Sequence, residues 1–318
     1  MQRKSLLIIG GTGFFGKSIL KYFLSRNSPE IKINKIFILS RKKLKIATYN
    51  KKLTKKIKIT KINSNMLTIK KLPIVDYVIY AAILKNYKND HRAVKKYLDL
   101  AKKYHSKSKI LYISSGAIYG KQPSSNNGFK ENYFKFYHKI NFKSGYKKEY
   151  SKIKLKNEKL FQEFGKIGGN VSVARCFSFV GEYLQRNSYY VLGNFIDSIL
   201  NKKNINVKSR YQIIRSYMHE EDLVRWLLKI INSSNSNCPI YNVGSDDAII
   251  IHKLASLLAK KYNLNINYEN KKISKNIIDK YIPNIDKAKK KLNLKNNYSS
   301  LEAIIETIKL LKKNEEIN

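Results

Sequence analysis

Hydrophobic residues in the first half of the chain form short apolar runs that alternate with longer amphipathic stretches. Apolar runs of about four to eight residues predict buried strands, and apolar positions three or four apart predict helices. Alternating strands and helices favour a parallel, doubly wound α/β sheet. Strands are expected near residues 5–9, 35–39, 57–60, 75–82, 109–113 and 171–174, and helices near 17–24, 90–104 and 146–164.

The first predicted strand runs directly into a glycine-rich turn, and a helix follows. Gly10 can take the tight turn, Gly13 lets the backbone approach a pyrophosphate, and Gly16 lets the helix pack close to the sheet. The helix N-terminus then turns its free N–H groups to the phosphates. An ordinary strand–helix turn is the alternative. The preferred interpretation is a Rossmann-type domain that contacts its dinucleotide through Gly10, Thr12, Gly13, Phe14, Phe15 and Gly16.

The residues after the second and fourth strands bear on which dinucleotide binds. An acidic residue after the second strand would bind the adenosine ribose, but Ser40 stands there and Arg41 follows. A cation at this point suits a 2′-phosphate, so NADP is slightly favoured over NAD, unless Arg41 is one more surface cation. Ala81 and Ala82 end the fourth strand, and their small side chains would let the cofactor lie against it.

Three further residues suggest proton-transfer chemistry. Ser115 follows the fifth strand, at the edge where parallel sheets bind ligands. Tyr150 and Lys154 are four residues apart on a predicted helix, and therefore lie on one face. A neighbouring ammonium favours the ionised form of a phenol, so Tyr150 could exchange a proton near neutral pH.

The order of these motifs resembles the extended short-chain dehydrogenase/reductase superfamily, in particular the NAD-dependent epimerase/dehydratase family. The resemblance covers nearly the whole chain. It rests on the glycine turn, Tyr80–Ala82, Ser114–Gly120, Tyr150–Lys154 with Glu158, Val173–Gly181, Arg215–Asp222, Tyr241–Gly244 and Tyr281–Asp286.

The resemblance implies that Ser115 hydrogen-bonds the reacting sugar oxygen, that Tyr150 is the general acid/base, and that Lys154 lowers its pKa and holds the nicotinamide ribose. It also implies a nucleotide-diphosphate sugar substrate, a role in bacterial surface polysaccharide synthesis, and a homodimer formed through the helix that carries Tyr150 and its neighbour. An alternative for Arg215 is an ion pair with Glu220, Glu221 or Asp222. The implied substrate-binding residues are Ser115, Ser178, Asn194 and Arg215.

The chain also departs from the family pattern. Enzymes of this family that remove water to form 4-keto-6-deoxy sugars resemble one another in an Asp-Glu pair after the catalytic serine or threonine. Gly116 and Ala117 stand at those positions and cannot move a proton. The expected activity is therefore a 4-ketoreductase or an epimerase. A 4,6-dehydratase and a non-catalytic dinucleotide-binding protein with a basic, nucleic-acid-binding surface are the alternatives.

Later segments predict a smaller, interleaved C-terminal substrate-binding lobe. The expected division assigns residues 1–177 to the Rossmann domain, with a return segment at about 214–245, and residues 178–213 and 246–318 to the lobe. Further helices are expected near residues 192–200, 221–231, 251–262, 284–292 and 300–311. The polar stretch 122–127 is expected to form a mobile loop beside the site.

Composition adds one unusual property, a net charge of +42 over 318 residues. The lysines are spread along the chain, which favours solvated faces over a nucleic-acid site. No apolar run approaches the roughly 20 residues of a membrane span, and no secretory signal pattern is present, so a cytoplasmic protein is expected. The two cysteines and the scattered histidines match no metal spacing, so no metal is expected.

Overall fold

A seven-stranded parallel sheet forms the centre of the molecule. The computed structural model describes residues 4–25, 30–42, 57–133, 146–186, 190–269 and 274–317. The strand order is β11-β6-β5-β4-β1-β2-β3, and each neighbouring pair is parallel. The predicted Rossmann-type fold is therefore confirmed. The strands are β1 (Lys4–Ile9), β2 (Ile33–Leu39), β3 (Lys58–Ile62), β4 (Tyr77–Tyr80), β5 (Lys109–Ser115), β6 (Asn170–Cys176) and β11 (Ile240–Val243).

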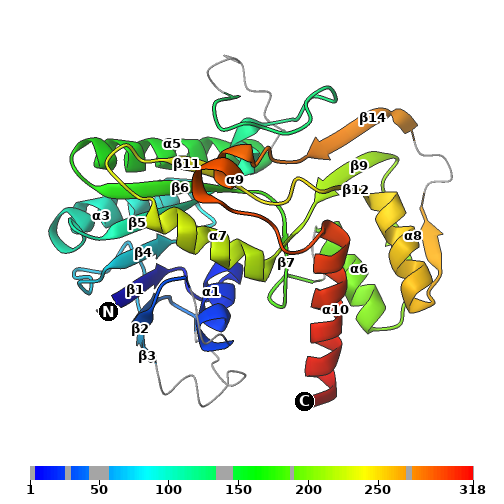
Figure 1. Cartoon of the computed structure of the whole chain (residues 1–318), viewed down its shortest axis with the longest axis horizontal. Coiled ribbons are helices and arrows are strands. Elements are labelled where there is room, and N and C mark those ends of the chain that lie inside the picture. The colour runs from blue at the N-terminus through cyan, green and yellow to red at the C-terminus, as the bar shows by residue number, and fades with distance from the viewer. Residues whose placement is uncertain are drawn as a thin grey trace.

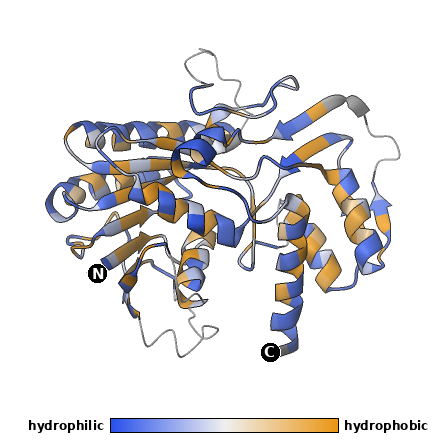
Figure 2. Cartoon of the chain, in the orientation of Figure 1, coloured by the Kyte–Doolittle hydropathy of each residue, from blue (hydrophilic) through white to orange (hydrophobic). Residues whose placement is uncertain are grey.

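Helices cover both faces of this sheet. Leu6 and Ile8 of β1 belong to a core that includes α1 (Phe14–Ser25) and α7 (Glu220–Asn232), and Figure 1 shows α7 in front of the sheet. Leu7 and Ile9 belong to the core on the other face, which α3 (Tyr87–Tyr104) and α5 (Tyr146–Lys166) cover. Successive side chains of a strand point to opposite faces, so a continuous apolar run is what a doubly covered strand requires. Figure 2 accordingly shows hydrophobic residues along the central strands.

The strand order reverses at β1, which lies between β2 and β4. Ligands of open α/β sheets bind in the crevice outside the carboxyl ends of the strands at such a switch point. The glycine turn follows β1, and Ala81 and Ala82 follow β4, at the same edge. Gly10 has a φ of +90°, and a Cβ there would lie 2.6 Å from the backbone nitrogen of Ala82. Only glycine fits so close an approach.

A third hydrophobic core lies beyond the sheet and joins segments from the second half of the chain. Helices α6 (Val191–Leu200), α8 (Ile251–Tyr262) and α10 (Ser300–Ile317) contribute to it. Figure 1 places these helices on the right of the molecule, beside a three-stranded sheet. That sheet has the order β12-β9-β14. Its strands are β12 (Ala248–Ile250), β9 (Tyr211–Ser216) and β14 (Ser274–Tyr281).

The short strands of this second region do not follow from the sequence pattern. β9 reads Tyr-Gln-Ile-Ile-Arg-Ser and is half-buried, so its apolar signal is weak. Its pairing with β14 joins residues more than 60 positions apart. The remaining short elements are β7 (Phe179–Val180), β8 (Ile205–Val207), β10 (Met218–His219), β13 (Ile266–Tyr268), the 3₁₀ helix η1 (Gly116–Tyr119) and α9 (Asp286–Leu292).

The polar stretch 122–127 differs from the mobile loop that we expect from its composition. Gln122 is buried, its Oε1 accepts a hydrogen bond from the Ile282 nitrogen at 2.8 Å, and its Nε2 donates to the Asn126 carbonyl at 3.0 Å. Lys280 also donates to the carbonyls of Ser124 and Asn126. These contacts tie the stretch to the end of β14.

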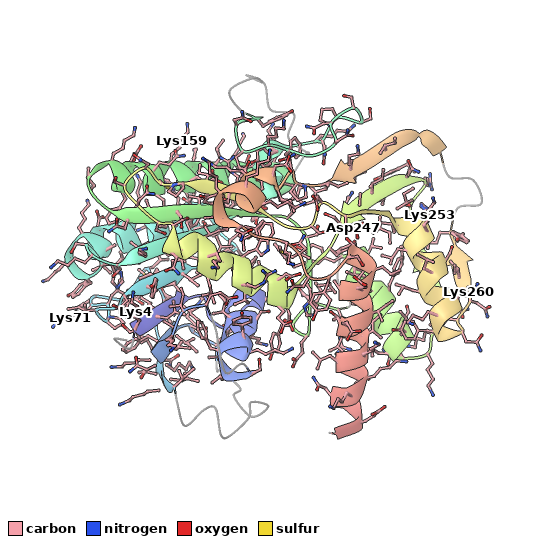
Figure 3. The ribbon with its side chains drawn as sticks, viewed as in Figure 1. Lys4, Lys71, Lys159, Asp247, Lys253 and Lys260 are labelled. Atoms are coloured by element: carbon pink, nitrogen blue, oxygen red, sulfur yellow. The ribbon has the colours of Figure 1, made fainter. Side chains whose placement is uncertain are left out.

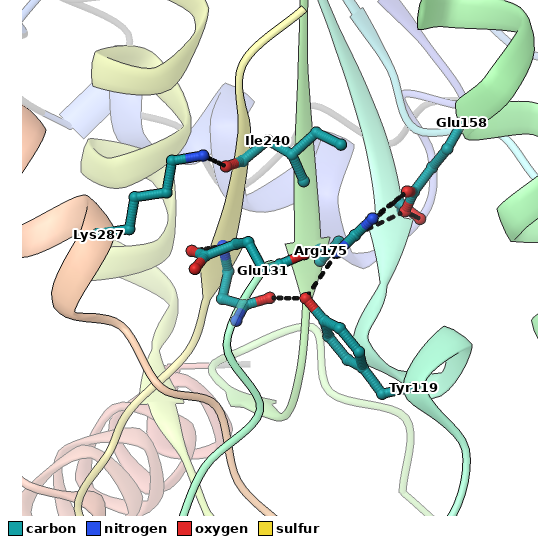
Figure 4. A network of polar contacts seen from close by, with 8 residues as sticks. Tyr119, Glu131, Glu158, Arg175, Ile240 and Lys287 are labelled. Carbon is teal, nitrogen blue, oxygen red and sulfur yellow. Dashed lines mark hydrogen bonds and ion pairs between the residues drawn. The ribbon is translucent and has the colours of Figure 1, made fainter. Parts of the chain in front are cut away.

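Side chains cap one edge of the central sheet, that of β11. The backbone nitrogen of Asn242 in β11 donates to Glu131 Oε1 at 2.8 Å, and Lys287 Nζ donates to the Ile240 carbonyl at 2.7 Å (Figure 4). These groups would otherwise be open to another strand. The loop that carries Glu131 and the helix α9, which carries Lys287, thus cover this edge of the sheet.

The lysines are distributed over the whole molecule. The lysines labelled in Figure 3 lie at widely separated points, with Lys71 and Lys159 beside the central sheet and Lys253 and Lys260 on α8. Within the described ranges, no helix is long and apolar enough to cross a membrane. The same ranges contain no group of three or more histidine, cysteine, aspartate or glutamate residues that could hold a metal ion.

Candidate active site

The glycine turn has the geometry of a phosphate cradle. A Cβ on Gly16 would lie 2.3 Å from the Cα of Gly11, so a side chain there would separate α1 from the turn. A Cβ on Gly13 would instead meet only the Gly10 carbonyl oxygen at 3.6 Å, which leaves that side of the turn open. No side chain of Gly13 covers the backbone where α1 begins, so a pyrophosphate can approach the helix N-terminus there. The residues present therefore fit a dinucleotide.

Ser40 lies in the same crevice, where an acidic residue would select NAD. It is buried, its hydroxyl is 2.7 Å from the Thr12 hydroxyl, and its Oγ accepts from the Lys42 nitrogen at 3.2 Å. The neighbouring Arg41 is exposed. The second strand therefore ends in a neutral hydroxyl held by the glycine turn, with an exposed cation beside it.

Ser115 is the last residue of β5 and caps η1. Its Oγ accepts a hydrogen bond from the Ala117 nitrogen at 3.2 Å, and its side chain is largely buried. Ser115 pairs with Cys176 at the end of β6, so both strands end at the same level. The serine hydroxyl is thereby fixed at the carboxyl edge of the sheet.

Lys154 reaches from α5 to the end of β5. Its Nζ donates to the carbonyl of Ile113 at 2.8 Å and lies 4.9 Å from the centre of the Tyr112 ring. Burial lowers the pKa of Lys154, and the carboxylate of Asp90 is the largest influence that opposes this shift. Tyr150 lies one turn before Lys154 on α5 and is half-buried. The structure thus brings the Lys154 ammonium to the strand that ends in Ser115.

A buried ion pair supports this end of the sheet. Arg175 donates to both carboxylate oxygens of Glu158, with a shortest distance of 2.8 Å from Nη2 to Oε2 (Figure 4). Ser114 also donates to Glu158, and Arg175 Nη1 donates to the Tyr119 hydroxyl at 2.8 Å. Burial lowers the pKa of Arg175, but Glu158 and then Tyr119 raise it above its ordinary value. The network joins α5, β6 and η1 around the strand end that carries Ser115.

The space beside Gly116 is filled by an aromatic ring. A Cβ on Gly116 would lie 2.6 Å from the Cε2 and Cζ atoms of Phe177. Phe177 is buried, and its ring centre is 4.8 Å from that of Tyr281. A side chain at position 116 would therefore displace Phe177.

Arg215 pairs with an acidic residue that the sequence analysis did not consider. Its Nη2 lies 2.9 Å from Asp279 Oδ2, and its Nη1 donates to the carbonyls of Asp279 and Ile214. Glu220 instead binds Lys21 and Ser18. The alternative partners proposed for Arg215, Glu220, Glu221 and Asp222, are therefore wrong, because β14 brings Asp279 across from β9.

Ser178 and Asn194 are the two other predicted substrate contacts, and the structure places them at half-buried and exposed positions. Ser178 is half-buried after β6, and its carbonyl accepts from the Met218 nitrogen at 3.1 Å. Asn194 is exposed on α6. These placements leave their contacts with a substrate as predictions.

Tyr281 is the residue at this site for which the sequence analysis gave no role. It ends β14 and pairs in register with Arg215 of β9. Burial raises the pKa of the Tyr281 phenol, whereas hydrogen bonding with Ser115 lowers it. The neighbouring Tyr150 raises the same pKa. Its motif, Tyr281–Asp286, is part of the family resemblance, but the spacing alone does not place it beside Ser115.

A glycine turn at the switch point of a doubly covered parallel sheet defines the class of Rossmann-type dinucleotide-binding proteins. Comparison of the sequence with family profiles places the chain within that class. The NAD-dependent epimerase/dehydratase family matches residues 6–244, and the chain belongs to this family. The comparison with curated proteins returned no match.

Solved structures are similar along nearly the whole chain. A dTDP-glucose 4,6-dehydratase from Bacillus anthracis, in complex with NAD, has a TM-score of 0.76 and 18% identity and covers 98% of both chains. A UDP-N-acetylglucosamine 4-epimerase from Methanobrevibacter ruminantium has a TM-score of 0.73 and 20% identity, covering 99% of this chain and 100% of that one. A UDP-glucose 4-epimerase from Thermotoga maritima has a TM-score of 0.74 and 17% identity, with coverage of 99% and 100%. These similarities show a shared fold.

Proposed function

We propose that the chain is an NAD(P)-dependent nucleotide-sugar oxidoreductase, either a 4-ketoreductase or an epimerase. The observation that carries this proposal is the arrangement of Ser115 and Lys154 around the end of β5, with Tyr150 one helical turn from Lys154. This group lies at the carboxyl edge of the sheet, where the glycine turn opens. Proton-transfer residues and a dinucleotide cradle thus share one edge.

Tyr150 acts as the proton donor or acceptor in this proposal. A bound nicotinamide supplies or takes up the hydride at the reacting sugar carbon. Tyr150 gives a proton to the oxygen when a carbonyl is reduced and takes one when a hydroxyl is oxidised. The Lys154 ammonium favours the phenolate of Tyr150 and donates to the nicotinamide ribose. Ser115 donates a hydrogen bond to the reacting oxygen.

The surroundings of Gly116 favour this chemistry over 4,6-dehydration. Dehydration needs acid/base groups next to the catalytic serine, and position 116 has no side chain. Phe177 fills the space that such a group would need. A ketoreductase or an epimerase needs only the single proton-transfer residue.

Arg215 is the proposed anchor for the substrate diphosphate. Arginine has five N–H donors in a fixed fork. Nη1 donates to two carbonyls, and one Nη2 hydrogen is directed at Asp279. Within the described part of the chain, no partner takes the Nε–H group or the second Nη2 hydrogen, and together they form a side-on fork that matches two oxygens of a phosphate. Ser178 and Asn194 are further proposed substrate contacts.

NADP is the slightly preferred cofactor in this proposal, with NAD as the alternative. Ser40 carries no charge that would repel a 2′-phosphate, and Arg41 is exposed beside it. The family name and an NAD-bound relative support a nicotinamide cofactor, and both name NAD.

The wider assignments are also proposals. The third core supports a substrate lobe of residues 178–213 and 246–318, separate from a Rossmann domain of residues 1–177 and about 214–245. We further propose a cytoplasmic homodimer, formed through α3 and α5, that acts in bacterial surface polysaccharide synthesis. The dispersed lysines support solvated faces rather than a nucleic-acid partner.

A cofactor and substrate screen tests the function. The purified protein is analysed for bound NAD or NADP and offered UDP-, dTDP-, CDP- and GDP-linked sugars together with 4-keto sugars. An epimerase retains its cofactor and interconverts sugars without net redox change, whereas a reductase consumes freely exchanging NADPH. Absence of nicotinamide binding together with absence of turnover contradicts the proposal, and salt-sensitive RNA binding would then support the non-catalytic alternative.

A further inference from the structure

Helix α1 is tied to a segment that comes from the end of β6. This connecting segment, residues 178–183, leaves the carboxyl edge of the central sheet and contains β7. The ring of Phe179 packs on the first turn of α1, with its centre 5.7 Å from that of Phe15 and 6.4 Å from that of Phe14. The connecting segment therefore reaches from the carboxyl edge of the sheet to the helix N-terminus that would hold the pyrophosphate.

Lys21 joins the connecting segment to α1 through its ammonium group. It lies two helical turns after Phe14 and therefore on the same face of the helix. Its Nζ is 2.7 Å from Glu182 Oε2, in the connecting segment, and 2.7 Å from Oε1 of Glu220, the first residue of α7. Burial lowers the pKa of Lys21, but the two carboxylates raise it above its ordinary value, so the amine stays charged. One ammonium thus binds two carboxylates.

The two carboxylates meet because paired strands precede them. Strands β7 and β10 pair in parallel, and Glu182 and Glu220 each come within two residues of their strand's end. Glu220 is almost fully buried, and its Oε2 accepts a hydrogen bond from the Ser18 hydroxyl of α1 at 2.9 Å. A Cβ on Gly181 would lie 2.5 Å from the carboxylate carbon of Glu220. Glu220 therefore has little room to move away from Lys21.

Tyr183 extends the contact along α1. Its ring centre is 5.2 Å from Lys17 Nζ and 5.9 Å from Lys21 Nζ. An ammonium within about 6 Å of an aromatic ring is attracted to it. The helix is thus held from Phe14 to Lys21, and a shift of the connecting segment would also move the first turn of α1, whose N–H groups face the proposed pyrophosphate.

We propose that Lys21 is a positioning residue for the dinucleotide: by binding Glu182 and Glu220, it holds the connecting segment against α1 and slows release of the cofactor. This inference rests on the proposed function, because it takes the cofactor to bind at the glycine turn. Lys21 lies about 10 Å along the axis from the start of α1, so it acts through the helix rather than by touching the phosphates. Without its ammonium, two carboxylates would face each other, and their repulsion would push the connecting segment away from α1 and α7.

The rate of cofactor release tests this role. The protein is loaded with NADPH or NADH, and stopped-flow fluorescence follows displacement by excess oxidised cofactor, while thermal unfolding is measured without cofactor. Lys21→Met is expected to speed release about tenfold, and Glu182→Ala, at a half-buried position, about fivefold. Glu316→Ala, at an exposed position of α10, is the matched control for loss of an acidic residue and should leave the rate within about twofold.

The sign of the Glu182→Ala effect separates positioning from general charge. Loss of a carboxylate makes the protein more positive, so a purely electrostatic effect would slow the release of an anionic cofactor. Loss of the contact with Lys21 is expected to speed it. In the Lys21→Met background, Glu182→Ala should not raise the rate further, because the shared contact is already absent.

The possible results decide between these roles. Unchanged or slower release from Glu182→Ala would overturn the positioning role, even if Lys21→Met failed to fold. Effects that multiply in the double variant would show that the two residues act separately, and would also overturn it. A wild-type protein that binds a nicotinamide cofactor but converts no sugar would contradict the proposed function, while the release rates would still decide the role of Lys21. A protein that binds neither NAD nor NADP would contradict both.

Discussion

The ring of Phe177 occupies the position into which a side chain on Gly116 would project, 2.6 Å from an ideal Cβ. The two residues come from neighbouring strand ends, because Gly116 follows β5 and Phe177 follows β6. Phe177 is in turn packed against Tyr281. The packing around Gly116 therefore leaves no room for an acidic side chain at the position after Ser115.

Because of the contact between Gly116 and Phe177, replacing this glycine by alanine should destabilise the protein rather than stabilise it. Gly116 is not among the glycines with positive φ, and at such positions a change from glycine to alanine usually stabilises by about 0.4–1 kcal/mol. Gly116→Ala is instead expected to destabilise by about 1–3 kcal/mol, because the new methyl group overpacks the Phe177 ring. Urea unfolding measures the change. The loss should shrink in a Phe177→Leu background, and a stabilised Gly116→Ala protein would contradict the packing described.

Replacement of the proposed acid/base should remove activity but not the fold. Tyr150→Phe is expected to lower kcat about 100-fold or more, the usual contribution of a positioned proton-transfer group. Nicotinamide absorbance or sugar interconversion reports the rate, and thermal unfolding reports the fold. Tyr268→Phe, at an exposed tyrosine, should retain full activity. Retained turnover in Tyr150→Phe would exclude Tyr150 as the acid/base.

The buried ion pair between Glu158 and Arg175 gives a prediction about stability. Glu158→Gln is expected to cost about 3–5 kcal/mol, because it leaves the Arg175 charge buried without its partner. Urea unfolding should show this loss, whereas Glu163→Gln, at an exposed position of the same helix, should change stability by less than about 0.5 kcal/mol. The double variant Glu158→Leu/Arg175→Met should recover much of the loss. Equal effects of Glu158→Gln and Glu163→Gln would show that the pair is unimportant.

The exposed cation after β2 gives a prediction about cofactor choice. Arg41→Ala is expected to raise the KM for NADPH about tenfold or more, since a hydrogen bond to a charged group contributes about 1.5–3 kcal/mol. The KM for NADH should stay within twofold, because NADH has no 2′-phosphate. Arg92→Ala on α3, another exposed arginine, serves as the control for a general loss of charge. If both cofactors are affected equally, Arg41 does not recognise a 2′-phosphate.

The proposed homodimer should become tighter as the salt concentration rises. A twofold interface brings the same surface of each copy together. The exposed residues of α3 and α5 include a set of cations, so a dimer formed there places like charges against each other. Salt screens such repulsion, and sedimentation should show tighter dimers at 0.5 M than at 0.05 M NaCl. A dimer that weakens with salt would exclude this interface. The exposed cations of these two helices are Lys88, Arg92, Lys95, Lys102, Lys103, Lys148, Lys152, Lys156, Lys159 and Lys166.

Much of the central sheet can be predicted because its signals are local. The apolar run before Gly10 and the glycine spacing determine a strand, a turn and a helix within a short segment. The stripe of apolar residues on α5 likewise predicts a helix that carries Tyr150 and Lys154 on one face. Each of these patterns lies within a single strand or a few helical turns. It can therefore be recognised in the sequence without knowledge of the tertiary structure.

The second region and part of the site depend on contacts between distant segments. Asp279 is 64 positions from Arg215, and Tyr281 is 166 positions from Ser115. Strand β9, which carries Arg215, is half-buried and has a weak apolar signal, and its pairing with β14 joins residues more than 60 positions apart. Sequence proximity instead suggests Glu220, Glu221 or Asp222 as the partner of Arg215. The Glu220 carboxylate binds Lys21 of α1, and the Asp222 carboxylate binds Arg225.

Glu131 and Lys287 end the central sheet by occupying hydrogen-bonding groups of its last strand, β11, with side chains. A further strand from another molecule would have to displace a carboxylate and an ammonium before it could pair. These two residues therefore protect the β11 edge against pairing with a strand of another molecule, a property distinct from thermodynamic stability. Loss of either charge should leave the monomer folded but make it prone to self-association through β11.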